Sequence, residues 1–251
     1  MTDSNYYTYL LRLADDSLIL GQRLSEWCGH GPVLEEDIAL SNIALDYVGQ
    51  ATNLYKQLSS TDSLGRDEDA IALTRQESEY TNLLLLELPN GDYAQTIARQ
   101  YFYSSFYLLF LEQLKLSSDA FLAGFAEKSI KEVKYHMQHA TDWMLRLGDG
   151  TAESHQRMQH AVNALWPYLG ELFLNDALDE SSVSEGWGVN RAALKSSWMD
   201  RLQSLFGEAR LEIPTESWHH KGGRSGRHTE HMGFLLAEMQ YLQRAYPGAK
   251  W

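Results

Sequence analysis

The chain has 251 residues, of which 44% are hydrophobic, and it carries a formal net charge of −13. This length can bury one substantial core without being divided, so we expect a single domain over residues 1–251. The negative charge excludes duplex nucleic acid as a partner, because neutralising phosphates takes clustered Lys and Arg side chains.

Signals for export, disulfide formation and membrane insertion are all missing from the sequence. Cys28 is the only cysteine and cannot form an internal disulfide. The first residues, MTDSNYYTYLLRLADD, lack both the basic and the long apolar region of a secretory signal. The most apolar stretch, residues 100–111, is shorter than the roughly 20 residues that cross a bilayer. We therefore expect a cytoplasmic protein without a membrane partner.

Apolar residues recur at spacings of three and four along most of the chain, and sustained alternation with period two is missing. This pattern predicts an all-α fold. The helices are expected at residues 6–27, 35–58, 70–86, 93–116, 120–147, 151–173, 191–212 and 229–246. Long helices with short connections are typical of a helical bundle, here with additional C-terminal helices.

Local signals refine several of these helices. The helix at 93–116 is apolar nearly all round, which indicates a central position. Asp92 and Thr151 are expected as N-caps, and Gly148 as the residue that ends the helix before Thr151. Cys28, at the end of the first helix, is expected to pack in the core.

The segment KEVKYHMQHATDW, residues 131–143, raises the question of a carboxylate-bridged di-iron site. Such a site needs two Glu-x-x-His pairs and two further carboxylates, all facing into a bundle. The residue three before His136 is Val133, and only His219 has a carboxylate at that spacing, Glu216. That pair follows Pro214 in a connecting segment. One pair in such a setting cannot form the site.

His136 nevertheless falls on the apolar stripe of its helix and is expected to point into the bundle. A buried imidazole needs a hydrogen-bond partner, and Glu132, one turn earlier, is a candidate. The residues therefore favour a hydrogen-bonded core histidine over a metal ligand.

Two further candidates lie near the end of the chain. His228 and His231 share a face at the start of the last expected helix, but Thr229 as a cap with the early Glu230 explains the pattern without a metal. The basic, glycine-rich segment KGGRSGR, residues 221–227, can hold a phosphate at a helix start. It matches no nucleotide-binding motif, so we interpret it as a flexible, solvated loop.

A resemblance to a known family is carried by five stretches: LRLADDSLILGQRLSEWCGHGP, IALSNIALDYVGQATNL, LPNGDYAQTIARQYF, IKEVKYH and HTEHMGFLLAEMQYLQR. From about Tyr9 to Trp251 the chain closely resembles the C subunits of the multicomponent phenylacetyl-CoA epoxidases of aerobic bacterial phenylacetate breakdown. The resemblance implies a ferritin-like helical fold. It also implies a non-catalytic paralogue of the A subunit, which carries the di-iron centre and pairs with this chain.

The reaction that the resemblance implies inserts one oxygen atom of O₂ into the aromatic ring, with NADPH electrons delivered by a separate reductase subunit. This chain would then be a monooxygenase component without activity of its own, and it would bind no cofactor. Its partners would be the catalytic A subunit and, beyond it, the small B subunit and the reductase.

The resemblance also implies that a metal site has been lost. One Glu-x-x-His pair of the catalytic paralogue falls on Tyr47 and Gln50, the other on Val133 and His136, and a further carboxylate falls near Ser104. Val133 adds apolar burial of roughly 1.5–3 kcal/mol where a metal-free Glu would be costly to desolvate. Tyr47 can fill the vacated space, with its hydroxyl meeting Gln50 or His136.

Two other functions stay open at this point. One is a self-sufficient metal-binding oxygenase that uses Glu132, His136 and Asp46 in a non-standard site, against which the ligand spacing argues. The other is a free-standing binding module.

Within the epoxidase interpretation, the basic segment has a possible role. Should it lie near the substrate channel of the partner, Lys221, Arg224 and Arg227 would contact the phosphates of coenzyme A.

Overall fold

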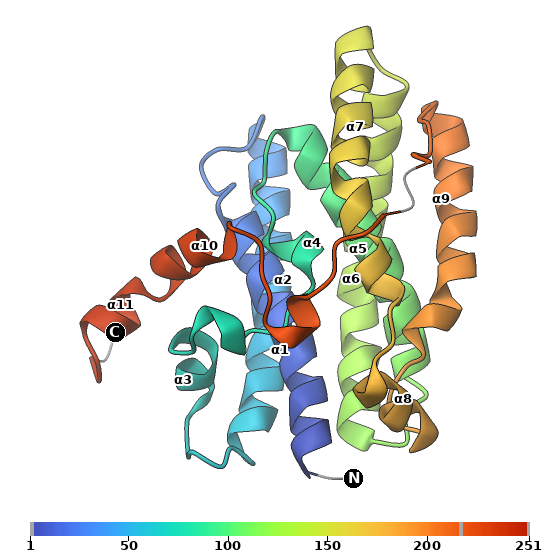
Figure 1. Ribbon diagram of the computed structural model, residues 1–251. Coiled ribbons are helices and arrows are strands. Elements are labelled where there is room, and N and C mark those ends of the chain that lie inside the picture. The colour runs from blue at the N-terminus through green and yellow to red at the C-terminus, as the bar shows by residue number, and fades with distance from the viewer. Residues whose placement is uncertain (1–2, 216–217, 250–251) are drawn as a thin grey trace. The chain divides into compact units, whose positions relative to one another are not determined.

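The computed structural model describes residues 3–215 and 218–249, and within these ranges every regular element is a helix (Figure 1). The prediction of an all-α, ferritin-like bundle with additional C-terminal helices is confirmed. Two compact units are formed, unit 1 by residues 1–89 and 221–251 and unit 2 by residues 90–220. The single domain expected over residues 1–251 stays a prediction.

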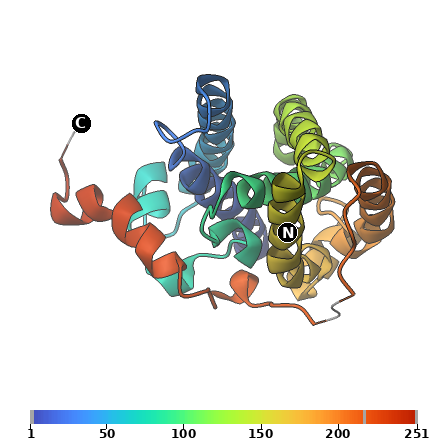
Figure 2. The ribbon, with the colours of Figure 1, turned by 90° about the horizontal axis from the view of Figure 1, so that it is seen from above.

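Unit 1 is built on a pair of long helices that pack along each other, α1 (Asp3–Ser25) and α2 (Leu34–Ser59). In Figure 2, α2 lies at the margin of this unit with α1 on its inner side. The shorter helices are α3 (Glu68–Leu73), α4 (Leu84–Glu87), α10 (Met232–Met239) and α11 (Tyr241–Ala245). Both α4 and α10 contact α1, so the C-terminal segment returns to the first helix of the chain.

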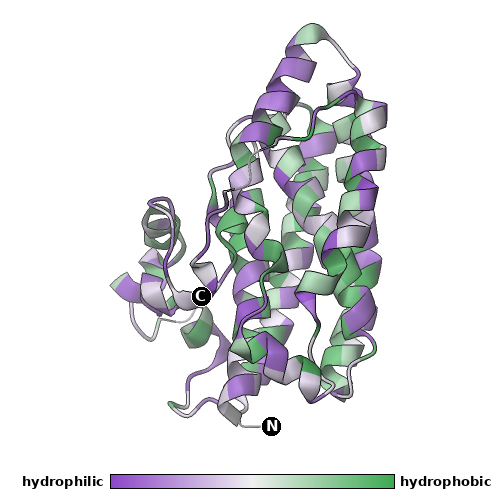
Figure 3. Ribbon diagram, turned by 45° about the vertical axis from the view of Figure 1, so that its right-hand side comes forward, coloured by the Kyte–Doolittle hydropathy of each residue, from purple (hydrophilic) through white to green (hydrophobic). Residues whose placement is uncertain are grey.

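Unit 2 is organised around α5 (Tyr93–Leu114), which packs against α6 (Ala120–Gly148), α7 (Ala152–Leu165) and α9 (Lys195–Ala209). A shorter helix, α8 (Ala177–Ser184), precedes α9. Most residues of α5 are buried, which confirms the central position predicted for it. Both hydrophobic and hydrophilic residues occur along each of the long helices, as expected where one side of a helix faces a core (Figure 3).

The helix expected at residues 70–86 is not continuous. It is replaced by α3, a 3₁₀ turn at Glu77–Glu79 and α4. The chain between them is held by carboxylates of α1, because the Thr81 amide donates to Asp15 and the Leu83 amide donates to Asp16, each over 2.8 Å. Backbone groups that bond to side chains in this way cannot also form helical hydrogen bonds.

Other local expectations had mixed outcomes. Asp92 and Thr151 are N-caps, accepting from amides of the first turns of α5 and α7. Gly148 is the last residue of α6, and the cap is the next residue along. Cys28 is exposed, so its expected core position is wrong. Within the described residues, none of the helices combines the length and apolar character that a bilayer crossing needs.

The second half of the chain also departs from the expected helices. After α7 the chain continues as 3₁₀ turns that include Pro167, which lacks the amide hydrogen a longer α-helix needs. The polar segment before α9 contains α8, whose start is fixed by a capping box between Asp176 and Asp179. The last helix expected begins only at Met232, so Thr229 is not its cap.

Candidate functional site

The five positions that the resemblance assigns to former metal ligands are divided between the two units. Tyr47 and Gln50 lie on the buried side of α2 in unit 1. Ser104 on α5, and Val133 and His136 on α6, are buried in unit 2. The burial expected for His136 is confirmed.

The donor atoms at these positions do not fit a carboxylate-bridged di-iron group. Of the five side chains, only the imidazole of His136 belongs to the Glu and His ligand set of such a group, and none is a carboxylate. Among the described residues, no group of three or more His, Cys, Asp or Glu side chains is placed to hold a metal ion. Glu216, the one carboxylate with Glu-x-x-His spacing, lies outside the described residues. The hydroxyl of Ser104 donates to the Gln100 carbonyl within α5 (2.5 Å).

Gln100 is a buried polar residue that the sequence analysis did not single out. Its side chain is fully buried, and neither the amide oxygen nor the amide nitrogen has a hydrogen-bond partner among the described residues. An unsatisfied buried amide carries a desolvation cost of about 1–3 kcal/mol. The available signal was a long polar side chain inside a helix whose residues are mostly buried.

The basic segment at residues 221–227 is packed against the rest of unit 1, unlike the flexible loop expected from its composition. Arg224 donates to both carboxylate oxygens of Asp16, over 3.0 and 2.7 Å, and to the carbonyls of Arg12 and Thr81. Its side chain is 13% exposed and that of Asp16 only 4%. Arg224 is therefore committed to this chain, whereas Lys221 and Arg227 are exposed.

Two glycines allow this close packing. A Cβ atom on Gly223 would lie 2.1 Å from the carbonyl oxygen of Asn82, and one on Gly226 would lie 2.1 Å from that of Ser78. Gly226 also has a φ of 71°, in the left-handed region that favours glycine. The two glycines thus allow two backbone segments to pack closely, and they do not make the segment flexible.

Glu87 is the centre of a second buried cluster in unit 1. Its carboxylate accepts from Nδ1 of His228 (2.7 Å), from the Asn82 amide nitrogen (2.8 Å) and from the backbone amide of Thr229. Nε2 of His228 lies 2.9 Å from the carbonyl oxygen of Tyr80. Because both ring nitrogens face acceptors, the doubly protonated imidazolium fits this position.

The pKa of His228 agrees with this geometry. Burial alone would lower it, but the hydrogen bond and the charge of Glu87 outweigh burial and raise the pKa above 6.5. Both ring nitrogens are therefore engaged within the fold. Binding of a metal ion by His228 and His231 would require these contacts of His228 to break.

A third cluster surrounds Asp15, which is fully buried on α1. Its carboxylate accepts from Arg75, from the hydroxyl of Tyr55 (2.6 Å) and from the amide and hydroxyl of Thr81. Burial and then the charge of Asp15 raise the pKa of Tyr55 well above 10, so the phenol keeps its proton. The guanidinium of Arg75 also lies 4.0 Å from the ring centre of Tyr80, a cation–π contact.

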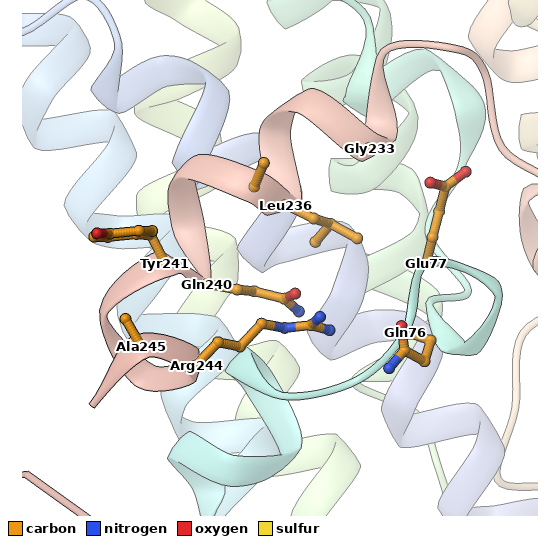
Figure 4. Close-up of a pocket in the computed structure, with 9 residues that line it drawn as sticks. Gln76, Glu77, Gly233, Leu236, Gln240, Tyr241, Arg244 and Ala245 are labelled. Atoms are coloured by element: carbon orange, nitrogen blue, oxygen red, sulfur yellow. The ribbon is translucent and has the colours of Figure 1, made fainter. Parts of the chain in front are cut away.

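A surface pocket of about 490 Å³ lies beside this cluster (Figure 4). Gln76 and Glu77 line it on one side, and Gln240, Tyr241 and Arg244 from the C-terminal helices line it on the other. The amide of Gln240 donates to the Arg75 carbonyl (2.9 Å) and to the Tyr80 hydroxyl (2.8 Å). These hydrogen bonds hold the C-terminal helices against the segment that contains Arg75 and Tyr80.

The fold and these positions define a class: a ferritin-like helical protein in which none of the five positions carries a carboxylate and the buried charges form internal ion pairs. The chain belongs to the phenylacetic acid catabolic protein family, whose profile matches residues 1–251. It is 46% identical over 243 residues to the C subunit of the 1,2-phenylacetyl-CoA epoxidase from Escherichia coli (strain K12). That alignment covers 97% of this chain and 98% of the relative. The family resemblance drawn from the sequence is confirmed.

Proposed function

We propose that this chain is the non-catalytic C subunit of a phenylacetyl-CoA 1,2-epoxidase and that it pairs with the di-iron catalytic subunit and stabilises it. The observation that carries the proposal is the 46% identity with the C subunit of the Escherichia coli epoxidase, which extends over nearly the full length of both chains. The lack of a carboxylate at the five positions that the resemblance assigns to metal ligands supports the non-catalytic part of the proposal.

In this proposal the chain binds no cofactor and acts in the cytoplasm. The di-iron centre, which supplies the oxygen chemistry, is on the catalytic subunit, and the small B subunit and the reductase complete the assembly. The residues of this chain keep the bundle folded without metal. Val133 fills core volume, and the buried pairs Asp16–Arg224 and Glu87–His228 hold the C-terminal segment in place.

The contact with coenzyme A phosphates is proposed for Lys221 and Arg227, which are exposed. Arg224, considered together with them, instead holds the segment against Asp16. The double variant Lys221→Glu/Arg227→Glu in the assembled complex is expected to raise the KM for phenylacetyl-CoA, while the melting temperature of the chain stays unchanged. An unchanged KM would remove the contact and leave the proposed role in the complex intact.

The pairing proposal is tested by producing the chain with and without the catalytic subunit and measuring association, iron and turnover. We expect a tagged chain to retain the catalytic subunit during purification. The isolated chain should contain almost no iron, and the complex should contain about two iron ions per pair of this chain and the catalytic subunit. Phenylacetyl-CoA epoxidation is expected only when both chains and the reductase are present.

Two results would contradict this proposal. Stoichiometric iron in the isolated chain would favour the self-sufficient metal-binding oxygenase, and Glu132 and His136 would be the first ligands to replace. A chain that remains alone when the catalytic subunit is present would favour the free-standing binding module.

A further inference from the structure

The outer face of α2 carries an exposed apolar stripe. The stripe consists of Leu34, Ile38, Leu45 and Val48. Steps of four, seven and three residues separate them, which places them on one face of a helix. Leu34 is 71% exposed and Leu45 67% exposed, and Ile38 and Val48 are also exposed. Single exposed apolar residues are common on protein surfaces, but a row of them along one helix marks an interaction site.

The exposed polar positions among the members of the stripe strengthen this interpretation, because they carry no charge. Asn42, Gly49 and Thr52 are exposed on the same side of α2. A surface helix normally presents charged side chains to water. From residue 38 to residue 52 the exposed residues of α2 are all apolar or neutral, and Asp46, at the edge of the stripe, is half-buried. This length corresponds to roughly 20 Å of helix, enough for a crossing helix from another protein.

We propose that the partner subunit of the epoxidase complex docks on this stripe through a helix with a matching apolar row and a basic rim. This assignment rests on the proposed function, and it adds the surface of this chain that carries the pairing. Space is available for close approach, since a Cβ atom on Gly49 would have nothing within 4 Å. A helix from the partner can therefore pack with its backbone near this position.

The charges of α2 identify the kind of partner. Glu35, Asp37 and Asp46 flank the stripe, and Lys56 near the end of the helix is the only basic residue of α2. A second copy of this chain would add the same acidic rim, and like charges across an interface are costly. The net charge of −13 acts in the same direction. A different chain with Lys or Arg beside its apolar row complements the stripe better than a second copy does.

The test uses the full-length chain and the catalytic subunit, with binding measured by interferometry on the immobilised catalytic subunit. Leu45→Lys places a charge at the centre of the stripe. Phe234→Lys is the matched control, because Phe234 is 76% exposed on α10 of the same unit and lies outside the stripe. We expect Leu45→Lys to weaken binding by about 30-fold or more, as for a central interface residue, and Phe234→Lys to change it by less than about threefold. Glu35→Lys is expected to slow association more than it speeds dissociation.

Each alternative occupant of the stripe gives a different result. If wild type binds and Leu45→Lys binds equally well, the surface assignment is wrong and the proposed function stands. If wild type does not bind, the proposed function fails and the assignment fails with it. A homodimer in light scattering that Leu45→Lys converts to a monomer would identify a second copy as the occupant. A melting temperature lowered by Leu45→Lys in the isolated chain, with Phe234→Lys unchanged, would mean that this chain itself covers the stripe.

Discussion

Replacing Arg224 with alanine tests whether the basic segment is a structural clamp. The substitution removes the hydrogen bonds to both carboxylate oxygens of Asp16 and to the carbonyls of Arg12 and Thr81. Asp16 is 3% exposed and would keep the amide of Leu83 as a donor. Removing one partner of a buried ion pair costs about 3–5 kcal/mol, because the remaining charge stays buried.

Since the side chain of Arg224 is 13% exposed, some water can reach the pair, and we expect the lower end of that range, about 3 kcal/mol. For a chain of this length such a loss lowers the melting temperature by about 6–12 °C. The assay is thermal and urea unfolding of the isolated chain followed by far-UV circular dichroism. Arg227→Ala is the control, three residues away and exposed, and should change stability by less than about 0.5 kcal/mol.

The reasoning would be refuted if the Arg224→Ala and Arg227→Ala variants unfolded at the same temperature. A second measurement separates the ion pair from the loss of carbonyl contacts. In a double-mutant cycle with Asp16→Asn, we expect a coupling energy of about 1–3 kcal/mol. A coupling energy near zero would assign the destabilisation to the carbonyl contacts alone.

Three further predictions concern stability. The pKa of His228 is raised above its unfolded value of 6.5. Its pair with Glu87 therefore stabilises the fold fully below pH 6.5, and this stabilisation is lost as the pH rises through the folded pKa. The difference in melting temperature between wild type and His228→Gln should shrink from about pH 6 to about pH 9. Gly223→Ala should lower the melting temperature because its Cβ would meet a carbonyl 2.1 Å away, whereas Gly207→Ala, with nothing within 4 Å, should not. Gln100→Leu should stabilise the chain by about 1 kcal/mol in urea unfolding by removing an unsatisfied amide; a loss of similar size would indicate that the amide is solvated or bound.

The long helices were predictable from the sequence because their patterns are strong and local. The expected range 120–147 matches α6 (Ala120–Gly148) closely, and 93–116 extends only slightly past the end of α5 (Tyr93–Leu114). Asp92 supplied a cap signal at the right place. A buried stripe or an apolar helix repeats over several turns, so small local errors do not change the assignment.

The segment around residue 80 could not be predicted in this way. Its backbone is held by Asp15 and Asp16, which are 66 and 67 residues away from their amide donors at Thr81 and Leu83. A local pattern of apolar residues does not contain that information, and tertiary contacts override helix propensity. The exposure of Cys28 has the same kind of explanation, since residue type alone does not say which side of a turn faces water.

The basic segment was misjudged for a related reason. A segment rich in glycine and arginine is typical of a solvated loop, but the contacts of Arg224 and Gly223 are made with residues far away in the sequence. Arg224 meets Asp16 across 208 positions, and Gly223 meets the backbone of Asn82. Neither partner can be inferred from the segment itself. The burial of Val133 and His136 was easier to predict, because the apolar stripe of α6 already placed both residues in a core.

The distribution of buried charge connects the fold with the proposed function. Among the described residues, mostly or fully buried side chains form the ion pairs Asp15–Arg75, Asp16–Arg224, Glu87–His228 and Asp179–Arg191. Each carboxylate has its own cation within the chain, so none of these four needs a metal ion to compensate its charge. The pairs of Asp16 and Glu87 also join segments more than 100 residues apart. A ferritin-like chain can therefore keep a specific fold by pairing its buried charges internally, and the outer face of α2 stays exposed for a partner.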